Sequence, residues 1–396
     1  MSNKVQKSVG LAMIGTGFAS TFHIENYKRV HGVPLQFVGN YSRNIDKAKA
    51  FAKEHGFEKT YESLDDLLND TNVDLVDVCV PNAFHEEFVI KVLNAGKHVV
   101  IEKPFTGAFI PPSKREDGWA KNLEEALASA NRMISTEKAS GFKIMYAENW
   151  VYAPGVQKAK RLLETSNSSI LRMIGEESHS GTHSKYAMDW KTSGGGSLYN
   201  KGCHLLGGAL YLKYQEGLRK FGKEIRPSWV VAASANLTES VAFTSDSDHY
   251  IRTGWKDSED WGTMIVGFDD GSVAQIMGAD TVLGGIQNQL TVFGTKATIK
   301  ININPNDAVL AYAPDETSFS GEYIREKVET TAGWQYTNPD EDWMNGFPNE
   351  MQDFVEAVVE NRDPLSGSFL GWDVVSTSYA AYLSIGSGKK VNIPTN

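Results

Sequence analysis

The stretch that decides the fold is residues 9–20, which read VGLAMIGTGFAS. An apolar run leads into Gly15, and a helix is expected to open after Gly17. Gly15 allows a tight turn, and Gly17 lets the backbone approach a pyrophosphate at the helix N-terminus. A serine, Ser20, replaces the third glycine of the dinucleotide fingerprint. A glycine-containing turn in any α/β protein could have a similar sequence, but the position of this loop directly after an N-terminal strand favours a dinucleotide site. The candidate cofactor-binding residues here are Gly15, Gly17, Phe18 and Ala19.

The end of the next expected strand bears on the choice between NAD and NADP. Residues 35–43 read LQFVGNYSR and contain no acidic residue. An acidic side chain there would bind the ribose 2′-hydroxyl of NAD. Ser42 and Arg43 are candidate cofactor-binding residues instead, and a hydroxyl with a guanidinium suits a 2′-phosphate. The prediction is therefore NAD(P) with a slight tilt to NADP. The alternative is that Arg43 stacks on adenine or lies in solvent.

Composition limits the classes of partner and compartment. The chain has 396 residues, 41% hydrophobic and 22% charged, which suits a soluble globular protein of two domains. The formal net charge of −10 argues against nucleic acid and anionic membranes as partners. The only two cysteines, Cys79 and Cys203, have no spacing partner for a disulfide or a zinc site. No signal peptide or membrane span is evident, so a cytoplasmic location is expected.

The hydrophobic pattern changes along the chain. Residues 1–149 alternate strand and helix and predict a dinucleotide-binding domain with a doubly wound parallel sheet. Its segment 105–121, rich in proline and glycine, is expected to be an irregular excursion at the mouth of the site, a lid or an oligomer contact. Residues 150–396 predict an α+β substrate and oligomerisation domain with an open, mainly antiparallel sheet, including a hairpin about 269–271. An apolar helix stripe over 351–359 should pack on that sheet or back on the first domain.

Three motifs carry a family resemblance: Glu102-Lys103-Pro104, Pro81-Asn82 with His85, and the triple glycine 194–196 with His204. The chain resembles the glucose–fructose oxidoreductase/inositol dehydrogenase (Gfo/Idh/MocA) family over nearly its whole length. The resemblance implies a Rossmann domain and a cis bond before Pro104. It also implies a homo-oligomer (dimer, tetramer or hexamer) and a small carbohydrate substrate: a sugar, glycoside or cyclitol. It adds these candidate cofactor-binding residues: Pro81, Asn82, His85, Glu102 and Lys103.

The same motifs indicate the candidate catalytic residues. Lys103 follows an apolar strand, whose carboxyl end should point at the cofactor, and its ammonium suits a developing oxyanion. His204 is the candidate base, because a histidine with an unperturbed pKa of about 6.5 titrates near neutral pH. The family usually has aspartate where Asn200 stands, so the proton chemistry should fall on His204 and Lys103. On one continuous helix, residues 200 and 204 would share a face.

Further polar and aromatic residues are expected around this pair. The candidate substrate-binding residues are Asn200, Glu148, Trp150 and His183. A metal site built from Glu148, His179, His183 and His204 is an alternative, but no tight ligand motif supports it, and no metal is predicted. Tyr186 and Trp190, with Trp150, suit the apolar face of a pyranose or ordinary core packing.

Two functions besides a dehydrogenase stay open. Some family members keep NAD bound and act as glycosidases by transient oxidation and elimination, and Asn200 leaves room for this. A non-catalytic nucleotide-binding sensor of sugar or redox state has only the Asn200 replacement in its favour. The leading hypothesis is an enzyme that moves a hydride between NAD(P) and a secondary hydroxyl or ketone of the substrate.

Overall fold

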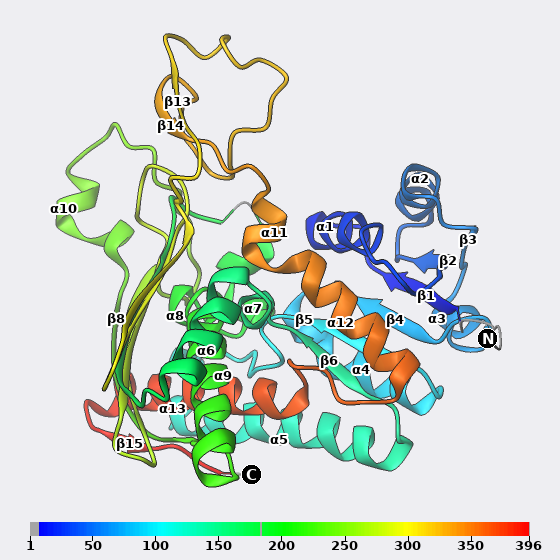
Figure 1. Ribbon diagram of the computed structural model, residues 1–396, viewed down its shortest axis with the longest axis horizontal. Coiled ribbons are helices and arrows are strands. Elements are labelled where there is room, and N and C mark those ends of the chain that lie inside the picture. Colours follow the sequence, from blue (N-terminus) through cyan, green and yellow to red (C-terminus); the bar gives the residue numbers. More distant parts are fainter. Residues whose placement is uncertain (1–7, 183, 396) are drawn as a thin grey trace.

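The computed structural model describes residues 8–182 and 184–395. Two sheets, each with its helices, lie side by side (Figure 1). Across the described part of the chain, no helix has the length and apolar character needed to span a bilayer. The fold is an N-terminal α/β half followed by an α+β half, as predicted.

The N-terminal half contains one sheet of six parallel strands in the order β3-β2-β1-β4-β5-β6. Its strands are β1 (Val9–Ile14), β2 (Leu35–Tyr41), β3 (Lys59–Thr60), β4 (Leu75–Val78), β5 (His98–Glu102) and β6 (Ile144–Ala147). Its helices are α1 (Phe18–Tyr27), α2 (Ile45–His55), α3 (Leu64–Leu68), α4 (His85–Asn94) and α5 (Gly118–Ser140). Strands β1, β4 and β6 are buried along their whole length, because helices cover both faces of a doubly wound sheet.

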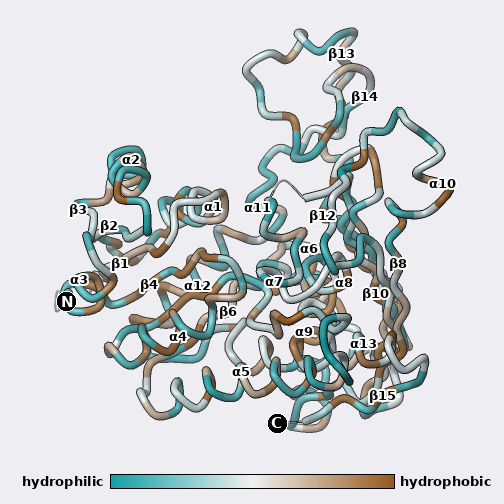
Figure 2. Tube along the Cα trace, turned by 180° about the vertical axis from the view of Figure 1, so that it is seen from behind, coloured by the Kyte–Doolittle hydropathy of each residue, from teal (hydrophilic) through white to brown (hydrophobic). Residues whose placement is uncertain are grey.

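Local signals place the helix ends. Asn44 caps α2 by accepting a hydrogen bond from the Lys47 backbone, and Gly56 ends that helix in the left-handed region. Ser63 and Asp66 form a capping box at the start of α3. Helix α2, at the edge of the molecule, is mostly hydrophilic (Figure 2).

The segment 105–121 differs from the prediction. A short 3-10 helix spans Pro112–Lys114, and α5 already begins at Gly118. The backbone of Ala108, a buried residue, receives a hydrogen bond from the Trp190 indole and donates one to the Tyr379 hydroxyl. None of the residues 105–121 lines the large pocket described below. The structure therefore does not place this stretch as a lid over the pocket: Ala108 is packed between the two halves, Ser113 and Lys114 are exposed, and the oligomer contact stays a prediction.

The C-terminal half carries a mixed, mostly antiparallel sheet in the order β12-β11-β7-β10-β9-β8-β15, in which only β7 and β10 pair in parallel among its described strands. Its strands are β7 (Ile170–Ser178), β8 (Pro227–Ala235), β9 (Trp261–Phe268), β10 (Val273–Ala279), β11 (Gln287–Gly294), β12 (Thr298–Asn304) and β15 (Val391–Asn392). The predicted hairpin is confirmed: β9 and β10 pair antiparallel about Gly271, which has a φ of 86°. A second hairpin, β13 (Leu310–Ala313) with β14 (Gly333–Tyr336), projects beyond the sheet (Figure 1).

The helices of this half cover one face of the sheet and reach the first half. They are α6 (Pro154–Ser166), α7 (Trp190–Ser193), α8 (Ser197–Asn200), α9 (Gly202–Phe221), α10 (Val241–Thr244), α11 (Glu341–Asn345), α12 (Phe347–Glu360) and α13 (Ser368–Ser387). Helix α12 packs against α1 and β1, while α13 lies along α5 and β8 (Figure 1). The buried stripe of α12 faces the first half because its apolar residues recur at helical spacing.

Candidate functional site

A large pocket of about 1160 Å³ lies between the two halves, at the carboxyl ends of the Rossmann strands. This is where open parallel sheets bind ligands. The volume slightly exceeds the ~300–1,000 Å³ of most small-molecule sites, so a dinucleotide and a second small molecule both fit. Its wall includes candidates from the glycine loop, the lysine motif and the histidine helix.

The glycine loop has the geometry that a dinucleotide needs. Gly15 has a φ of 112°, and a Cβ there would lie 2.2 Å from the carbonyl oxygen of Cys79, so only glycine fits. A Cβ on Gly17 would meet open space, which leaves its backbone free for close approach by a ligand. Helix α1 starts directly after, so its first N–H groups point to this part of the pocket. Phe18 and Ala19 also line the pocket.

Ser42 and Arg43, at the end of β2, both line the pocket. Thr16 and Ser42 approach each other at 3.5 Å through their hydroxyl oxygens. The Arg43 guanidinium lies over the Phe84 ring, 5.6 Å from its centre. Sequence reasoning missed Asp65, which also lines the pocket and comes from the start of α3 rather than from the end of β2.

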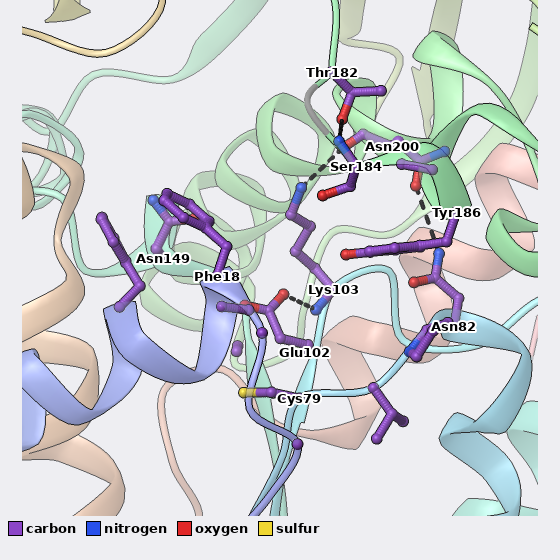
Figure 3. A pocket seen from close by; sticks show the side chains of 18 of the residues that line it. Phe18, Cys79, Asn82, Glu102, Lys103, Asn149, Thr182, Ser184, Tyr186 and Asn200 are labelled. Carbon is purple, nitrogen blue, oxygen red and sulfur yellow. Dashed lines mark hydrogen bonds between the residues drawn. The ribbon is translucent and has the colours of Figure 1, made fainter. Parts of the chain in front are cut away.

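The lysine motif joins the two halves. The bond between Lys103 and Pro104 is cis, as the resemblance implied. The Lys103 ammonium donates to the Asn200 carbonyl oxygen at 3.1 Å (Figure 3). The Asn82 amide donates to the Ser193 carbonyl oxygen at 2.8 Å. Burial would lower the pKa of Lys103, but facing acidic groups, among them Glu102, raise it above its ordinary value. Lys103 is therefore a permanent cation in the pocket.

Glu102 faces the pocket beside this lysine. Its Oε2 accepts a hydrogen bond from the Lys103 backbone N–H at 2.8 Å (Figure 3). Burial would raise the pKa of Glu102, but its contact with His23 lowers it to about 2. Pro81 lines the pocket nearby. Glu102 is therefore an anion, and its carboxylate orients the backbone of Lys103.

His85 lies elsewhere than expected. It is wholly buried, and its ring contacts the carbonyl oxygens of Pro104 and Val80, each at 3.0 Å. It does not line the pocket. His85 braces the loop behind the lysine motif, so the structure does not support a direct contact with cofactor.

His204 and Glu148 form a buried pair. His204 Nδ1 lies 2.8 Å from Glu148 Oε1, and His204 reaches the pocket wall. Burial lowers the pKa of His204 to about 4. The charge of Glu177 acts to raise this pKa, and the charge of Lys103 acts to lower it further. Burial also raises the pKa of Glu148 well above its usual range. The expectation of a histidine that titrates near neutral pH was therefore wrong, since burial keeps the imidazole neutral at pH 7.

The expected continuous helix through residues 200 and 204 is interrupted. Helix α8 ends at Asn200, α9 begins at Gly202, and Lys201 between them has a φ of −109°. The Asn200 amide donates to the carbonyl oxygens of Gly195 and Gly196 at 2.8 and 3.1 Å. Asn200 and His204 both line the pocket but occupy separate elements. Glu148, rather than residue 200, is the partner of His204.

The other predicted substrate residues divide between pocket and core. Trp150 borders the pocket although its residue is only 1% exposed, and Tyr186 lines it. Trp190 is buried against Ala108 and does not line it. His179 lines the pocket, with its Nδ1 accepting from the Gly181 backbone. His183 lies outside the described residues.

The described residues of the alternative metal site, Glu148, His179 and His204, do not form one group of ligand atoms. Among the described residues, Glu148, Cys203 and His204 bring one ligand atom each to within 4.8 Å of one another. His179 is not a member of that group, and Glu148 and His204 already engage each other.

Sequence reasoning also missed several charged residues of the pocket, among them Glu177, Lys201 and Lys327. Glu177 ends β7 and lies near His204, while Lys201 forms an ion pair with Asp280 at 2.7 Å. Lys327 enters from the segment between β13 and β14, with a φ of 60°. The proximity of Lys201 to the glycine motif was a usable signal. Nothing in the local sequence marks Lys327, because only the path of the chain brings it to the pocket.

Comparisons with known proteins match this architecture. Residues 9–115 fit the model of an oxidoreductase family with an NAD-binding Rossmann fold, and residues 177–393 fit the C-terminal alpha/beta domain of the same family. The second match alone spans more than half of the chain.

Individual relatives agree with these matches. A scyllo-inositol 2-dehydrogenase (NADP(+)) of Bacillus subtilis is 29% identical over 155 residues, which is 39% of this chain and 41% of that protein. The chain thus spans about two fifths of the length of that relative. The myo-inositol 2-dehydrogenase of Thermotoga maritima is 21% identical over 97% of this chain and 98% of its own.

A solved structure shares the whole fold. GenD2 from gentamicin A biosynthesis, in complex with NAD, superimposes with a TM-score of 0.81 at 22% identity and covers 100% of this chain and 98% of its own. With both family domains matched in order, this chain belongs to the Gfo/Idh/MocA oxidoreductase family.

Proposed function

We propose that this protein is an NAD(P)-dependent oxidoreductase that moves a hydride between the nicotinamide and a secondary hydroxyl or ketone of a sugar, glycoside or cyclitol. One observation carries the proposal: the glycine loop, the Lys103 ammonium and His204 line the same pocket. Carbohydrate-acting relatives, including the inositol dehydrogenases named above, support the substrate class.

The residues divide the chemistry as follows. When bound, the cofactor supplies the hydride acceptor or donor, held by Gly15, Gly17 and the N-terminus of α1. Oxidation of an alcohol requires a base for the hydroxyl proton and a cation beside the oxygen that loses it. Lys103 Nζ is that cation. In the tautomer in which His204 Nδ1–H donates to Glu148 Oε1, Nε2 is the nitrogen that accepts the proton. In the reverse direction, the same nitrogen returns it.

The test is a spectrophotometric assay of the pure protein with a panel of polyols, sugars and glycosides, with both NAD and NADP and in both directions. We expect a change in nicotinamide absorbance with at least one substrate. Release of an aglycone without net change in NADH would indicate the glycosidase instead. Binding of nucleotide with no turnover of any compound would indicate the sensor.

For the cofactor, we infer a slight preference for NADP. Ser42 and Arg43 line the pocket at the end of β2, where a ribose 2′-phosphate would need a hydroxyl and a guanidinium. Arg43→Ala should weaken binding of NADP more than binding of NAD, as measured by calorimetric titration of each. Equal loss for the two cofactors would contradict this role.

For assembly, we propose a homo-oligomer that forms through the open face of the C-terminal sheet. Val231, Ile265 and Ile174 lie in one row across paired strands, and each is at least 38% exposed. Such a face is typical of protein contacts. Light scattering should give a mass that is a multiple of 43.6 kDa, and Ile265→Lys should reduce it. A monomer at micromolar concentration would refute the proposal.

A further inference from the structure

A buried histidine outside the pocket connects the dinucleotide loop with the lysine motif. His23 lies on α1, is 1% exposed and does not line the pocket. Its Nδ1 lies at hydrogen-bond distance, 2.9 Å, from Asp77 Oδ2, and its Nε2 lies 2.9 Å from Glu102 Oε1, an ion-pair distance without the alignment of a hydrogen bond. One ring therefore joins a helix to the ends of two neighbouring strands, β4 and β5.

These contacts define the charge of the ring. A neutral imidazole has one N–H, whereas an imidazolium has two and can face a carboxylate on each side. The other titratable groups around His23 are Cys79, whose sulfur lies 3.5 Å from Nδ1, and the buried Tyr27 and Glu350. None of these three is a cation. Burial has the largest single effect and lowers the pKa of His23, but the charges of Asp77 and Cys79 and the hydrogen bonds to them together raise it well above 6.5.

Glu102 transmits the position of this histidine to the lysine. Its Oε1 contacts His23, and its Oε2 accepts the Lys103 backbone N–H at 2.8 Å. In Figure 3 the Glu102 side chain lies directly beneath the Lys103 chain, which reaches toward Asn200. The rotamer of Glu102 thus depends on the ring behind it, and the backbone of Lys103 depends on Glu102.

We propose that His23 is a positioning residue: an imidazolium clamped between Asp77 and Glu102 that ties helix α1, at the dinucleotide loop, to the backbone of Lys103. The inference rests on the proposed function in one respect: it takes Lys103 to be the cation that assists hydride transfer. It adds that His23 is required for the reaction although it touches neither cofactor nor substrate.

The charge state is tested on the intact protein without any assay of activity. Nitrogen NMR of protein labelled in its histidines should show one ring, assigned by its loss in His23→Gln, that stays an imidazolium at pH 8. A neutral His23 at pH 7 would overturn the proposal. The NMR measurement needs no substrate. A neutral His23 would therefore contradict the positioning role alone, whereas absence of turnover would contradict the proposed function.

The positioning role is tested by kinetics of His23→Gln, with His55→Gln as the matched control. His55 is another buried histidine of this half, paired with Glu25 at 3.0 Å and remote from the lysine motif. We expect His23→Gln to bind NAD(H) nearly as the parent does and to lower kcat about 10²-fold, the cost of a reacting group misplaced by about 1 Å.

The pH profile separates positioning from a general loss of structure. Without the imidazolium, Glu102 loses the partner that lowers its pKa to about 2, so it protonates at higher pH. The acid limb of kcat should therefore move upward in His23→Gln but not in His55→Gln. Parental kcat with an unmoved limb, or the same change in both variants, would overturn the proposal. If His23→Gln does not fold, sequential backbone assignment of the parent protein identifies the His23 ring instead, and its charge state in the NMR measurement decides.

Discussion

Oxidation by this protein should remain fast at pH 5, where an ordinary histidine base would already be protonated. Burial lowers the pKa of His204 to about 4. A base with that pKa is about 90% neutral at pH 5, whereas a histidine with an ordinary pKa of ~6.5 is only about 3% neutral. The buried environment therefore predicts a roughly 30-fold larger fraction of neutral base at pH 5 than an exposed histidine would have, so the rate at pH 5 should stay close to its own value at pH 7.

The direction of the pH dependence follows from the lowered pKa of His204. Only the neutral imidazole accepts a proton, so activity is fully present above the folded pKa and falls as pH drops through about 4. The assay is kcat/KM for oxidation between pH 4 and 8, which reports the free enzyme. Circular dichroism at each pH checks that the protein stays folded.

Two variants test whether the pH–rate profile reports the protonation of His204. His204→Ala should lower kcat about 10² to 10⁴-fold across this range while nucleotide binding is retained. His31→Ala, which removes an exposed ring bonded to Gln352, should leave the profile unchanged. An acid limb with a midpoint near pH 6.5 would refute the role of burial. If His204→Ala retains most activity, His204 is not the base.

Three other substitutions test the pocket. Lys103→Met should lower kcat about 10² to 10³-fold in the same assay, because the developing oxyanion loses its cation; unchanged kcat would exclude that role. Gly15→Ala should abolish dinucleotide binding, as measured by calorimetry, because the added methyl group would collide with the Cys79 carbonyl oxygen. Gly56→Ala is the control: Gly56 also has a positive φ but faces open space, so this variant should keep binding and lose only about 1–2 kcal/mol in free energy of unfolding. Asn200→Asp should lower the free energy of unfolding in urea by roughly 1–3 kcal/mol, because a carboxylate cannot donate to the carbonyl oxygens of 195–196; an unchanged midpoint would contradict this.

Much of the fold was predictable because its signals are local. The apolar run into Gly15 predicted β1 and the turn to α1, and the Asp-Gly at 270–271 predicted the β9–β10 hairpin. Periodicity is a property of neighbouring residues, so it survives without knowledge of the rest of the chain. The segment 105–121 was misjudged for the converse reason. Its prolines and glycines exclude regular structure over most of it, but they do not say whether the irregular backbone is exposed or buried.

The sequence by itself determined the family, the parallel and antiparallel halves, and the residues of the glycine and lysine motifs. Only the tertiary structure decided what surrounds them. Glu148 pairs with His204 across 56 positions, His23 with Glu102 across 79 (102 − 23), and Lys327 comes to the pocket from a distant hairpin. The pKa of a buried group depends on its desolvation and on the charges around it. Both arise from contacts between remote segments, and so the charge states of His204 and His23 follow from the packed structure alone.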